Sequence, residues 1–117
     1  MTSRQTKRWV IPKGNLDDDG SPHSDAACEA EEEAGVRGIL GPTPLGTFQY
    51  LKRMESGESI LAEVVVFRLD VTEELVDWKE RAERDRRWFS VADAAAAVDE
   101  ADLSDLILAF GQSIVVD

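Results

Sequence analysis

The chain has 117 residues, of which 43% are hydrophobic, enough for one core but not for two. Its formal net charge of -11 opposes binding to a nucleic-acid polymer, because the overall field repels a phosphate backbone. The one cysteine, Cys28, cannot form an internal disulfide and suits a reducing cytoplasm, and no stretch is apolar enough to span a bilayer. We therefore expect a single cytoplasmic domain over residues 1–117, with neither a membrane nor a nucleic-acid polymer as partner.

The first third of the chain predicts a strand, a loop and a helix. Residues 8–12 (RWVIP) are apolar and close with a proline, and residues 14–24 are rich in Gly, Asp, Asn and Ser. Ser21 followed by proline is typical of a helix start, and Gly35 after an alanine is typical of a helix end. The helix is therefore predicted over residues 22–34.

The middle of the chain predicts a β-hairpin. Residues 45–52 and 59–71 are rich in β-branched and aromatic side chains, and the segment between them has turn chemistry around Gly57. Residues 64–67 are apolar on both faces, which is typical of a strand that helices cover on both sides.

The C-terminal part predicts a short strand and two helices. Residues 87–89 (RWF) form the strand, and Ser90 is placed to cap a helix over residues 91–98. A last helix follows, with apolar residues at helical spacing: Leu103, Leu106, Ile107, Phe110 and Ile114. Because Trp9 and Trp88 lie in apolar segments, we expect them in the core, and Trp78 on the surface.

The predicted helix over residues 22–34 carries the chemistry. Glu29, Glu32 and Glu33 are at positions i, i+3 and i+4, so their carboxylates are expected on one face. Crowded carboxylates repel one another unless a cation lies between them, and their hard oxygens suit Mg²⁺ or Mn²⁺. The alternative is a solvated acidic helix face without a metal.

These residues resemble the Nudix box, whose pattern is Gly, five residues, Glu, seven residues, Arg-Glu-U-x-Glu-Glu-x-Gly-U, where U is a bulky aliphatic. With Gly14 as the first glycine, the three glutamates and Gly35 are in register. The pattern fails at Gly20, where it has Glu, and at Cys28, where it has Arg. The flanking segments RWVIPKG, LGTFQYLK and RDRRWF look like the subgroup of diphosphoinositol polyphosphate and diadenosine polyphosphate phosphohydrolases, and the resemblance extends over residues 3–110.

This resemblance implies an α/β fold, the Nudix α/β/α sandwich with a mixed central sheet. The chain begins after the usual first strand, so either the true start lies upstream, or other segments or a second copy cover the exposed sheet edge. A homodimer is therefore expected.

The resemblance also implies a Mg²⁺-dependent hydrolase of a diphosphate bond. The substrate would be a nucleoside polyphosphate, a dinucleoside polyphosphate or a diphosphoinositol polyphosphate. Glu29, Glu32 and Glu33 would be the metal ligands, and Glu32, Glu33 or a downstream carboxylate would accept a proton from the attacking water. Glu80 is the first choice for that downstream carboxylate, and Glu63 is the weaker one.

Residues near the box are expected to bind the phosphates of the substrate: Arg4, Arg8, Lys13, Gly14, Lys52 and Arg84. Two alternatives stay open, since surface cations also serve solubility and Arg84 has Glu80 and Glu83 as possible partners.

The two departures from the box predict a slower enzyme. In the family, the arginine at the position of Cys28 pairs with neighbouring glutamates, and a thiol cannot supply that bidentate contact. Gly20 is the lesser departure. The alternative function is a catalytically weakened Nudix domain that acts as a sensor of a phosphorylated ligand or as an interaction module.

Overall fold

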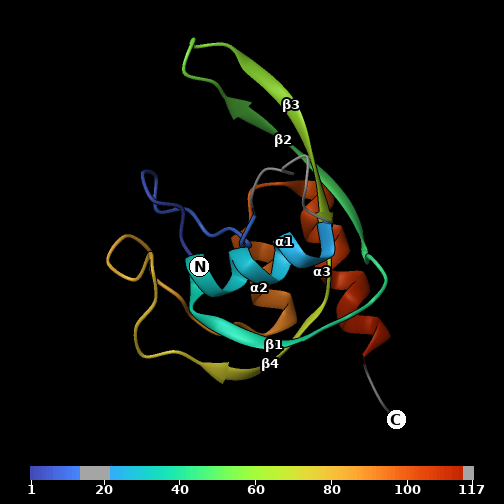
Figure 1. Cartoon of the computed structure of the whole chain (residues 1–117). Coiled ribbons are helices and arrows are strands. Elements are labelled where there is room, and N and C mark those ends of the chain that lie inside the picture. Colours follow the sequence, from blue (N-terminus) through green and yellow to red (C-terminus); the bar gives the residue numbers. More distant parts are fainter. Residues whose placement is uncertain (14–21, 115–117) are drawn as a thin grey trace. The chain divides into compact units, whose positions relative to one another are not determined.

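The computed structural model describes residues 1–13 and 22–114, so Gly14 and Gly20 lie outside the described residues (Figure 1). The chain forms two compact units, Met1–Pro44 with Phe67–Trp88 and Leu45–Val66 with Phe89–Asp117, and each is described by itself. In the part of the chain that the structure covers, every helix is too short or too polar to cross a membrane.

The first unit contains the predicted acidic helix. Helix α1 (Pro22–Glu29) continues directly into η1 (Ala30–Ala34), a turn of π-helix, so the predicted bounds are confirmed. The helix ends at Gly35, whose φ of 67° lies in the left-handed region that favours glycine.

Strand β1 (Val36–Leu40) follows the helix along the chain. It pairs antiparallel with β4 (Leu69–Glu74), which comes from later in the sequence (Figure 1). The sequence did not predict β1. It predicted one strand over residues 59–71, but the chain changes partners there, because β4 pairs with β1 while the preceding strand pairs elsewhere. Which strands pair depends on residues far apart along the chain. The continuous apolar sequence of residues 59–71 therefore did not show that it forms two strands with different partners.

The N-terminal segment folds back on itself beside the 67–88 segment. Trp9 pairs with Thr2 in an isolated bridge, which is all that forms of the strand predicted over residues 8–12. The Thr2 backbone N–H donates to the Asp85 carbonyl at 2.9 Å, and the Asp85 N–H donates to the Thr2 hydroxyl at 2.9 Å. Thr2 is buried, so these bonds satisfy polar groups that water does not reach.

The second unit begins with the predicted hairpin. Strands β2 (Gly46–Arg53) and β3 (Ser59–Val66) pair antiparallel in unbroken register, with Phe48 opposite Val64. The sequence placed residues 64–67 centrally in a sheet, whereas β3 has β2 as its one neighbouring strand in the described chain.

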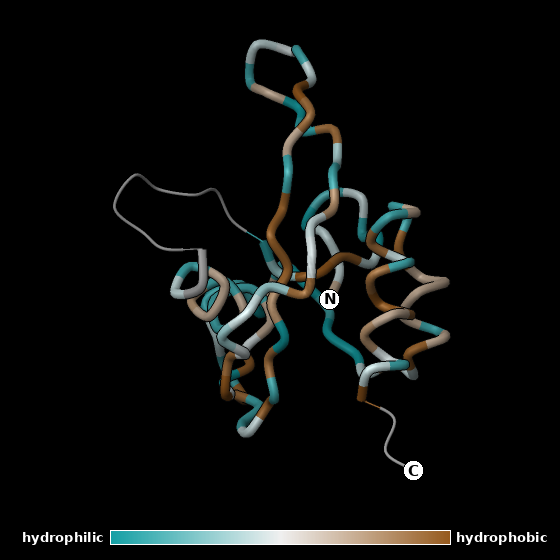
Figure 2. Tube along the Cα trace, turned by 90° about the vertical axis from the view of Figure 1, so that its right-hand side faces the viewer, coloured by the Kyte–Doolittle hydropathy of each residue, from teal (hydrophilic) through white to brown (hydrophobic). Residues whose placement is uncertain are grey.

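Two helices complete this unit, α2 (Val91–Ala97) and α3 (Ala101–Ser113). The Ser90 hydroxyl accepts from the Asp93 N–H at 3.2 Å, which confirms the predicted cap. Hydrophobic and hydrophilic residues alternate around the turns of α3 (Figure 2), and Leu103 is 2% exposed. Burial of such a leucine stabilises the fold by roughly 2 kcal/mol.

Side-chain hydrogen bonds join the elements of the second unit. Ser104 on α3 donates to the Ala95 carbonyl on α2 at 2.8 Å. The Asp102 carboxylate accepts from the Gln49 N–H of β2 at 2.8 Å, so the start of α3 is tied to the hairpin. The predicted helices of this unit are therefore both confirmed and fixed to their neighbours.

The α/β class is confirmed, since helices and strands occur in both units. Where the sequence predicted one mixed sheet, the described strands form two antiparallel pairs. Residues 87–89 form no strand, and Trp88 is 67% exposed, so its predicted place in the core is wrong. Without a strand to turn it inward, the indole lies outside and donates to the Glu74 carboxylate at 2.7 Å.

Candidate active site

The acidic helix ends in a wide turn that changes which glutamates share a face. The Gly35 N–H donates to the carbonyls of Ala30 and Glu31, and the bond to Ala30 is of the i to i+5 type that defines a π-turn. More residues per turn rotate Glu32 away from its neighbours, relative to a regular α-helix. The face predicted from the i, i+3, i+4 arithmetic is therefore divided.

Glu33 is the buried glutamate of this turn, with 4% of the residue exposed. Its carboxyl lies within hydrogen-bond reach of Glu29, one turn earlier. Burial, followed by the hydrogen bond with Glu29, raises the pKa of Glu33 to about 8, although the Arg84 charge opposes this rise. The Glu33 carboxyl, which faces Glu29, thus retains a proton at neutral pH.

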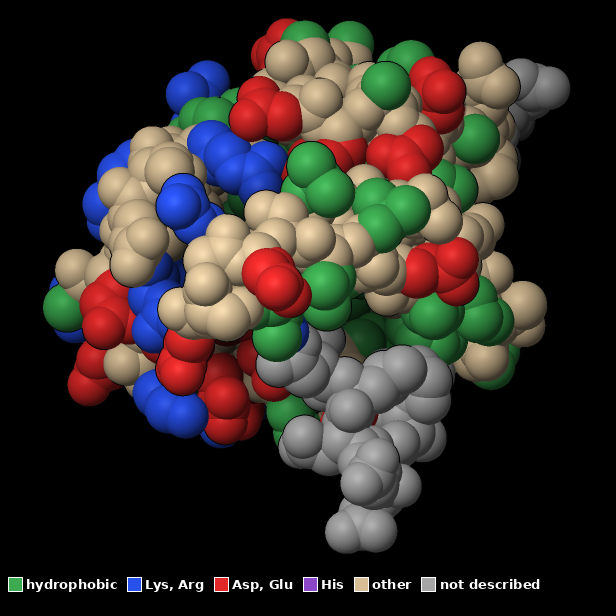
Figure 3. Space-filling view, turned by 90° about the horizontal axis from the view of Figure 1, so that it is seen from above, with side chains coloured by type: hydrophobic (Ala, Val, Ile, Leu, Met, Phe, Trp, Pro, Cys, Tyr) green, Lys and Arg blue, Asp and Glu red, His purple; other side chains and the backbone are tan. Residues whose placement is uncertain are grey.

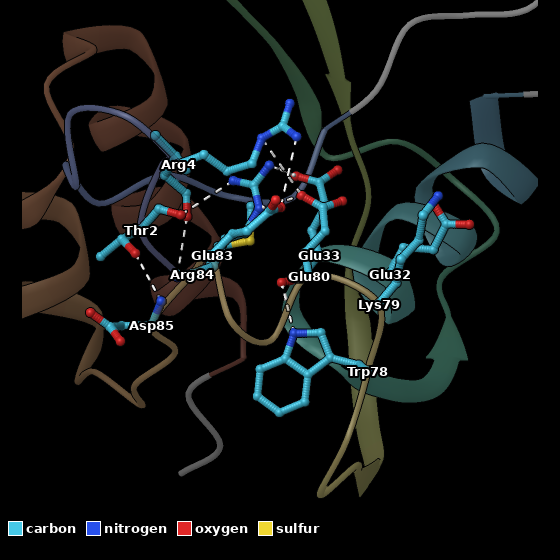
Figure 4. Close-up of polar contacts among 12 residues, drawn as sticks. Thr2, Arg4, Glu32, Glu33, Trp78, Lys79, Glu80, Glu83, Arg84 and Asp85 are labelled. Carbon is cyan, nitrogen blue, oxygen red and sulfur yellow. Dashed lines mark hydrogen bonds and ion pairs between the residues drawn. The ribbon is translucent and has the colours of Figure 1, made fainter.

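Arg84 connects the N-terminal segment to this pair (Figure 4). Its Nη2 lies 3.3 Å from Glu33 Oε1, its Nε donates to Glu80 Oε1 at 2.8 Å, and its Nη1 donates to the Thr2 carbonyl at 3.2 Å. The Arg84 side chain is 11% exposed. Ion pairs shielded from water in this way are screened much less by salt than surface pairs.

Glu80 lies beside Glu33, although the two are 47 positions apart in the sequence (Figure 4). Its backbone N–H donates to the Glu32 carbonyl at 3.0 Å, and its negative charge contributes to the raised pKa of Glu33. Its side chain is 15% exposed and lies 3.9 Å from Arg4. The structure therefore places Glu80 in this carboxylate cluster, where the sequence had left open an exposed glutamate in a charged connection.

Glu32 lies on another side of the helix end. Its carboxylate is 3.6 Å from Lys79 Nζ, and both side chains are substantially exposed (Figure 4). Nearby, Glu31 pairs with Arg37 of β1. Consecutive glutamates of the box thus have three different cationic partners in Arg37, Lys79 and Arg84.

Trp78 and Arg86 hold the C-terminal end of the helix. The Trp78 indole donates to the Glu33 carbonyl at 3.2 Å, and the Arg86 guanidinium lies 4.2 Å from the centre of the same ring. Arg86 also donates to the carbonyls of Ala34 and Gly35, at 3.1 and 2.9 Å. A helix end has unpaired carbonyls and a partial negative charge, so a cation here both bonds and neutralises it.

The same ring explains the glycine of the box. A Cβ atom at Gly35 would lie 2.4 to 2.8 Å from atoms of the Trp78 ring, closer than real Cβ contacts allow. Trp78 was expected on the surface as a ligand contact, whereas it is half-buried against the helix end. The sequence held no sign of this packing, because the two residues are far apart along the chain.

The donor chemistry of the site fits a hard divalent cation. Glu33 offers carboxyl oxygens in a buried place beside Glu29, and hard oxygens of this kind suit such a cation. Over residues 1–13 and 22–114, no three metal-ligating side chains are assembled around one point, since Glu32 lies apart. Glu29 and Glu33 are therefore the two glutamates of the predicted metal set that the structure brings together.

The predicted phosphate-binding residues lie in different parts of the chain. Arg4 is exposed and lies 3.8 Å from Glu83 as well as near Glu80, so it borders the carboxylate cluster. Arg8 and Lys13 lie in the half-buried N-terminal segment of the same unit. Lys52 and Glu63 belong to β2 and β3 of the other unit. On the face drawn in Figure 3, cationic and acidic side chains are interspersed.

Comparison with known proteins gives a family for this arrangement. The NUDIX domain matches residues 1–110, which includes both units. Nudix hydrolase 12, mitochondrial, of Arabidopsis thaliana is 43% identical over 88 residues, which cover 73% of this chain and 43% of that protein. Diphosphoinositol polyphosphate phosphohydrolase 3-alpha of Mus musculus is 38% identical over 95 residues, covering 80% of this chain and 54% of that protein. The chain thus spans about half the length of the curated relatives it matches.

Proposed function

We propose that this chain, which belongs to the Nudix family, hydrolyses a phosphoric anhydride bond of a small phosphorylated substrate with the help of Mg²⁺. The observation that carries the proposal is the buried carboxyl of Glu33, within hydrogen-bond reach of Glu29 at the end of the box helix. Burial of a carboxyl is costly, and Glu33 and Glu80 share one arginine, Arg84, so the cluster favours a further cation over a solvated helix face. The names of the mouse relatives favour a diphosphoinositol polyphosphate or another densely phosphorylated molecule as substrate.

Glu29 and Glu33 would hold the metal, and Glu32 would join them as the third ligand of the predicted set. Mg²⁺ is the proposed ion, with Mn²⁺ as a substitute, and when bound it would neutralise phosphate charge and lower the pKa of an attacking water. Glu32 would have to leave Lys79 to join them, a small cost because that ion pair is exposed. Glu33 would bind the metal as a carboxylate, so binding would release its proton.

Glu80 is the proposed acceptor of the proton from water. It approaches Glu33 from the 67–88 segment, and its side chain retains some exposure to solvent. Glu32 and Glu33 remain the other proposed acceptors. Glu63 is the weaker proposal, since it lies on β3 in the second unit.

Arg4 is the proposed phosphate contact nearest to the cluster. It is 59% exposed and its two ion pairs, with Glu80 and Glu83, are long, so a substrate phosphate can replace these partners at low cost. The sequence prediction gave this role also to Arg8, Lys13, Gly14, Lys52 and Arg84. The first four remain proposed for it, whereas the shielded Arg84 is better suited to another role.

The experiment that tests the proposal measures release of hydrolysis products, which are orthophosphate, pyrophosphate or nucleotides according to the substrate and are separated by anion-exchange chromatography. A panel of nucleoside polyphosphates, dinucleoside polyphosphates and diphosphoinositol polyphosphates is incubated with the chain, with Mg²⁺ or with EDTA. Release that requires Mg²⁺ and is abolished in Glu33→Gln supports the proposed hydrolase and identifies the substrate. Binding of a compound without release would instead support the alternative function, a sensor of a phosphorylated ligand. The absence of the box arginine at position 28 is the reason for considering that alternative.

Two further proposals concern assembly and location. A homodimer would cover strand edges of the two-stranded sheets in the described chain, and a mass in solution that stays monomeric over a range of concentrations would refute it. A cytoplasmic location is proposed from the single cysteine, while the names of two plant relatives place those proteins in mitochondria.

A further inference from the structure

Position 28 of this chain lacks the arginine of the Nudix box, yet Glu33 does not lack a guanidinium partner. Cys28 is exposed, and a thiol cannot form a bidentate ion pair. Arg84 comes from the 67–88 segment instead, and its Nη2 lies 3.3 Å from Glu33 Oε1. The same pairing of a box glutamate with an arginine is thus made from another part of the chain.

We propose that Arg84 is the positioning residue for Glu33 and replaces the arginine that is missing at position 28. The proposal rests on the proposed function for the role of Glu33, and it adds how this chain keeps that carboxylate in place. It also assigns to Arg84 a different task from phosphate binding.

The geometry around Arg84 favours positioning over substrate binding. Each of its three nitrogens already has a protein acceptor: Glu33 for Nη2, Glu80 for Nε and the Thr2 carbonyl for Nη1. The three acceptors come from three segments of the chain, so the planar guanidinium is fixed before any ligand arrives. With 11% of the side chain exposed, it offers little surface to a phosphate, unlike Arg4, which is 59% exposed.

The first test uses Arg84→Ala with Mn²⁺ alone as the probe, titrated without substrate and followed by electron paramagnetic resonance. The loss of a cation beside carboxylates would by itself tighten Mn²⁺ binding. Loss of positioning acts in the opposite direction, and we expect affinity to fall about ten- to a hundredfold, as for other groups that orient a metal ligand. Arg81→Ala is the matched control, because Arg81 is exposed and its ion pair, with Asp77, is long.

The second test measures steady-state kinetics on the substrate found by phosphate release. We expect Arg84→Ala to lower kcat by a factor similar to the loss in Mn²⁺ affinity, while KM stays within about twofold. If KM rises at unchanged kcat and unchanged Mn²⁺ affinity, Arg84 binds substrate and the proposal is wrong. Should the wild type release no phosphate, the proposed function fails, while the Mn²⁺ titration still decides the role of Arg84.

The third test asks whether an arginine at position 28 restores what Arg84→Ala removes. Position 28 is four and five residues before Glu32 and Glu33, one turn along the helix. We expect the double variant Cys28→Arg with Arg84→Ala to recover most of the Mn²⁺ affinity and kcat, while Arg84→Lys recovers less, since one ammonium cannot serve three acceptors. A role in folding alone would leave the double variant as impaired as Arg84→Ala.

The same double variant covers the case in which Arg84→Ala does not fold. If it folds and binds Mn²⁺ like the wild type, the exchange of arginines is supported. If the double variant binds Mn²⁺ weakly, the proposal is refuted. It is also refuted if Cys28→Arg alone, with Arg84 present, raises kcat about tenfold or more, because the wild-type site would then lack a positioning arginine.

Discussion

Glu32 and Glu33 are neighbours in sequence, but they lie on two sides of the helix end that differ in burial and in the strength of their ion pairs. On one side, Glu33 is buried, lies within hydrogen-bond reach of Glu29 and is paired with the shielded Arg84. On the other side, Glu32 is half-exposed and pairs with the ammonium group of Lys79, whose long side chain is 69% exposed. A carboxylate on the first side has one fixed position, whereas a carboxylate on the second is available to change partners. The box therefore combines a fixed carboxylate with an adaptable one.

The largest effect expected from this difference is on catalysis. Glu33→Gln should lower kcat by on the order of a thousandfold, because it removes a charged ligand worth several kcal/mol of transition-state stabilisation. Glu32→Gln should lower kcat by about ten- to a hundredfold, since a residue that changes partners is more easily replaced by water. Phosphate release at saturating Mg²⁺ measures both, and equal losses would remove the distinction between the two sides.

The next effect is on stability at the boundary between the two sides. Gly35→Ala should lower the free energy of unfolding by about 3 kcal/mol, because it combines a left-handed backbone with a clash against Trp78. Gly57→Ala is the control, since Gly57 also has a positive φ but would meet nothing within 4 Å. It should cost only about 1 to 2 kcal/mol in denaturant unfolding. A larger loss at Gly57 would show that the Trp78 contact is unimportant.

A smaller effect follows from the raised pKa of Glu33. In the folded state Glu33 keeps its proton up to about pH 8, whereas in the unfolded state it loses the proton near pH 4.5. The contribution of this group to the free energy of unfolding is therefore complete below pH 4.5 and is lost as the pH rises to about 8. In EDTA, Tm should therefore fall more between pH 6 and 8 in the wild type than in Glu33→Gln. Mg²⁺ replaces the proton, and it should raise Tm more at pH 8 than at pH 6. Parallel slopes in the two proteins would argue against a protonated Glu33.

The smallest effect belongs to the exposed side. Lys79→Ala should change the free energy of unfolding by less than about 0.5 kcal/mol, because exposed ion pairs are weak and well screened. Denaturant unfolding at low and high salt checks this value. A loss comparable to that of Gly35→Ala would mean that Glu32 is held as firmly as Glu33.

The sequence predicted what depends on local chemistry. Proline and serine at helix starts, and glycine at the helix end, act within one turn of the chain, so the bounds of residues 22–34 and the Ser90 cap were accessible. The hairpin was accessible for the same reason, since its turn lies between two adjacent strands. The box itself was visible because its spacing is local.

What the sequence could not show depends on partners far away along the chain or on a small change in helix geometry. Helical spacing alone predicted three glutamates on one face, but the π-turn of η1 separates Glu32 from the other two. No local pattern distinguishes Arg84 from Arg86 or Arg81, although the first holds Glu33, the second holds the helix end and the third is exposed. The roles of Arg84 and Arg86 follow from contacts between residues 51 or 52 positions apart.

The contact between Trp78 and the Glu33 carbonyl also gives the molecule an optical reporter. Indole fluorescence responds to the polarity around the ring and to its hydrogen bond, and this ring lies directly under the turn that carries the buried glutamate. Trp88 is exposed, so its emission differs from that of a half-buried ring. A variant with phenylalanine in place of Trp9 and Trp88 would retain one indole, and its emission would follow the helix end during a metal titration without any added label.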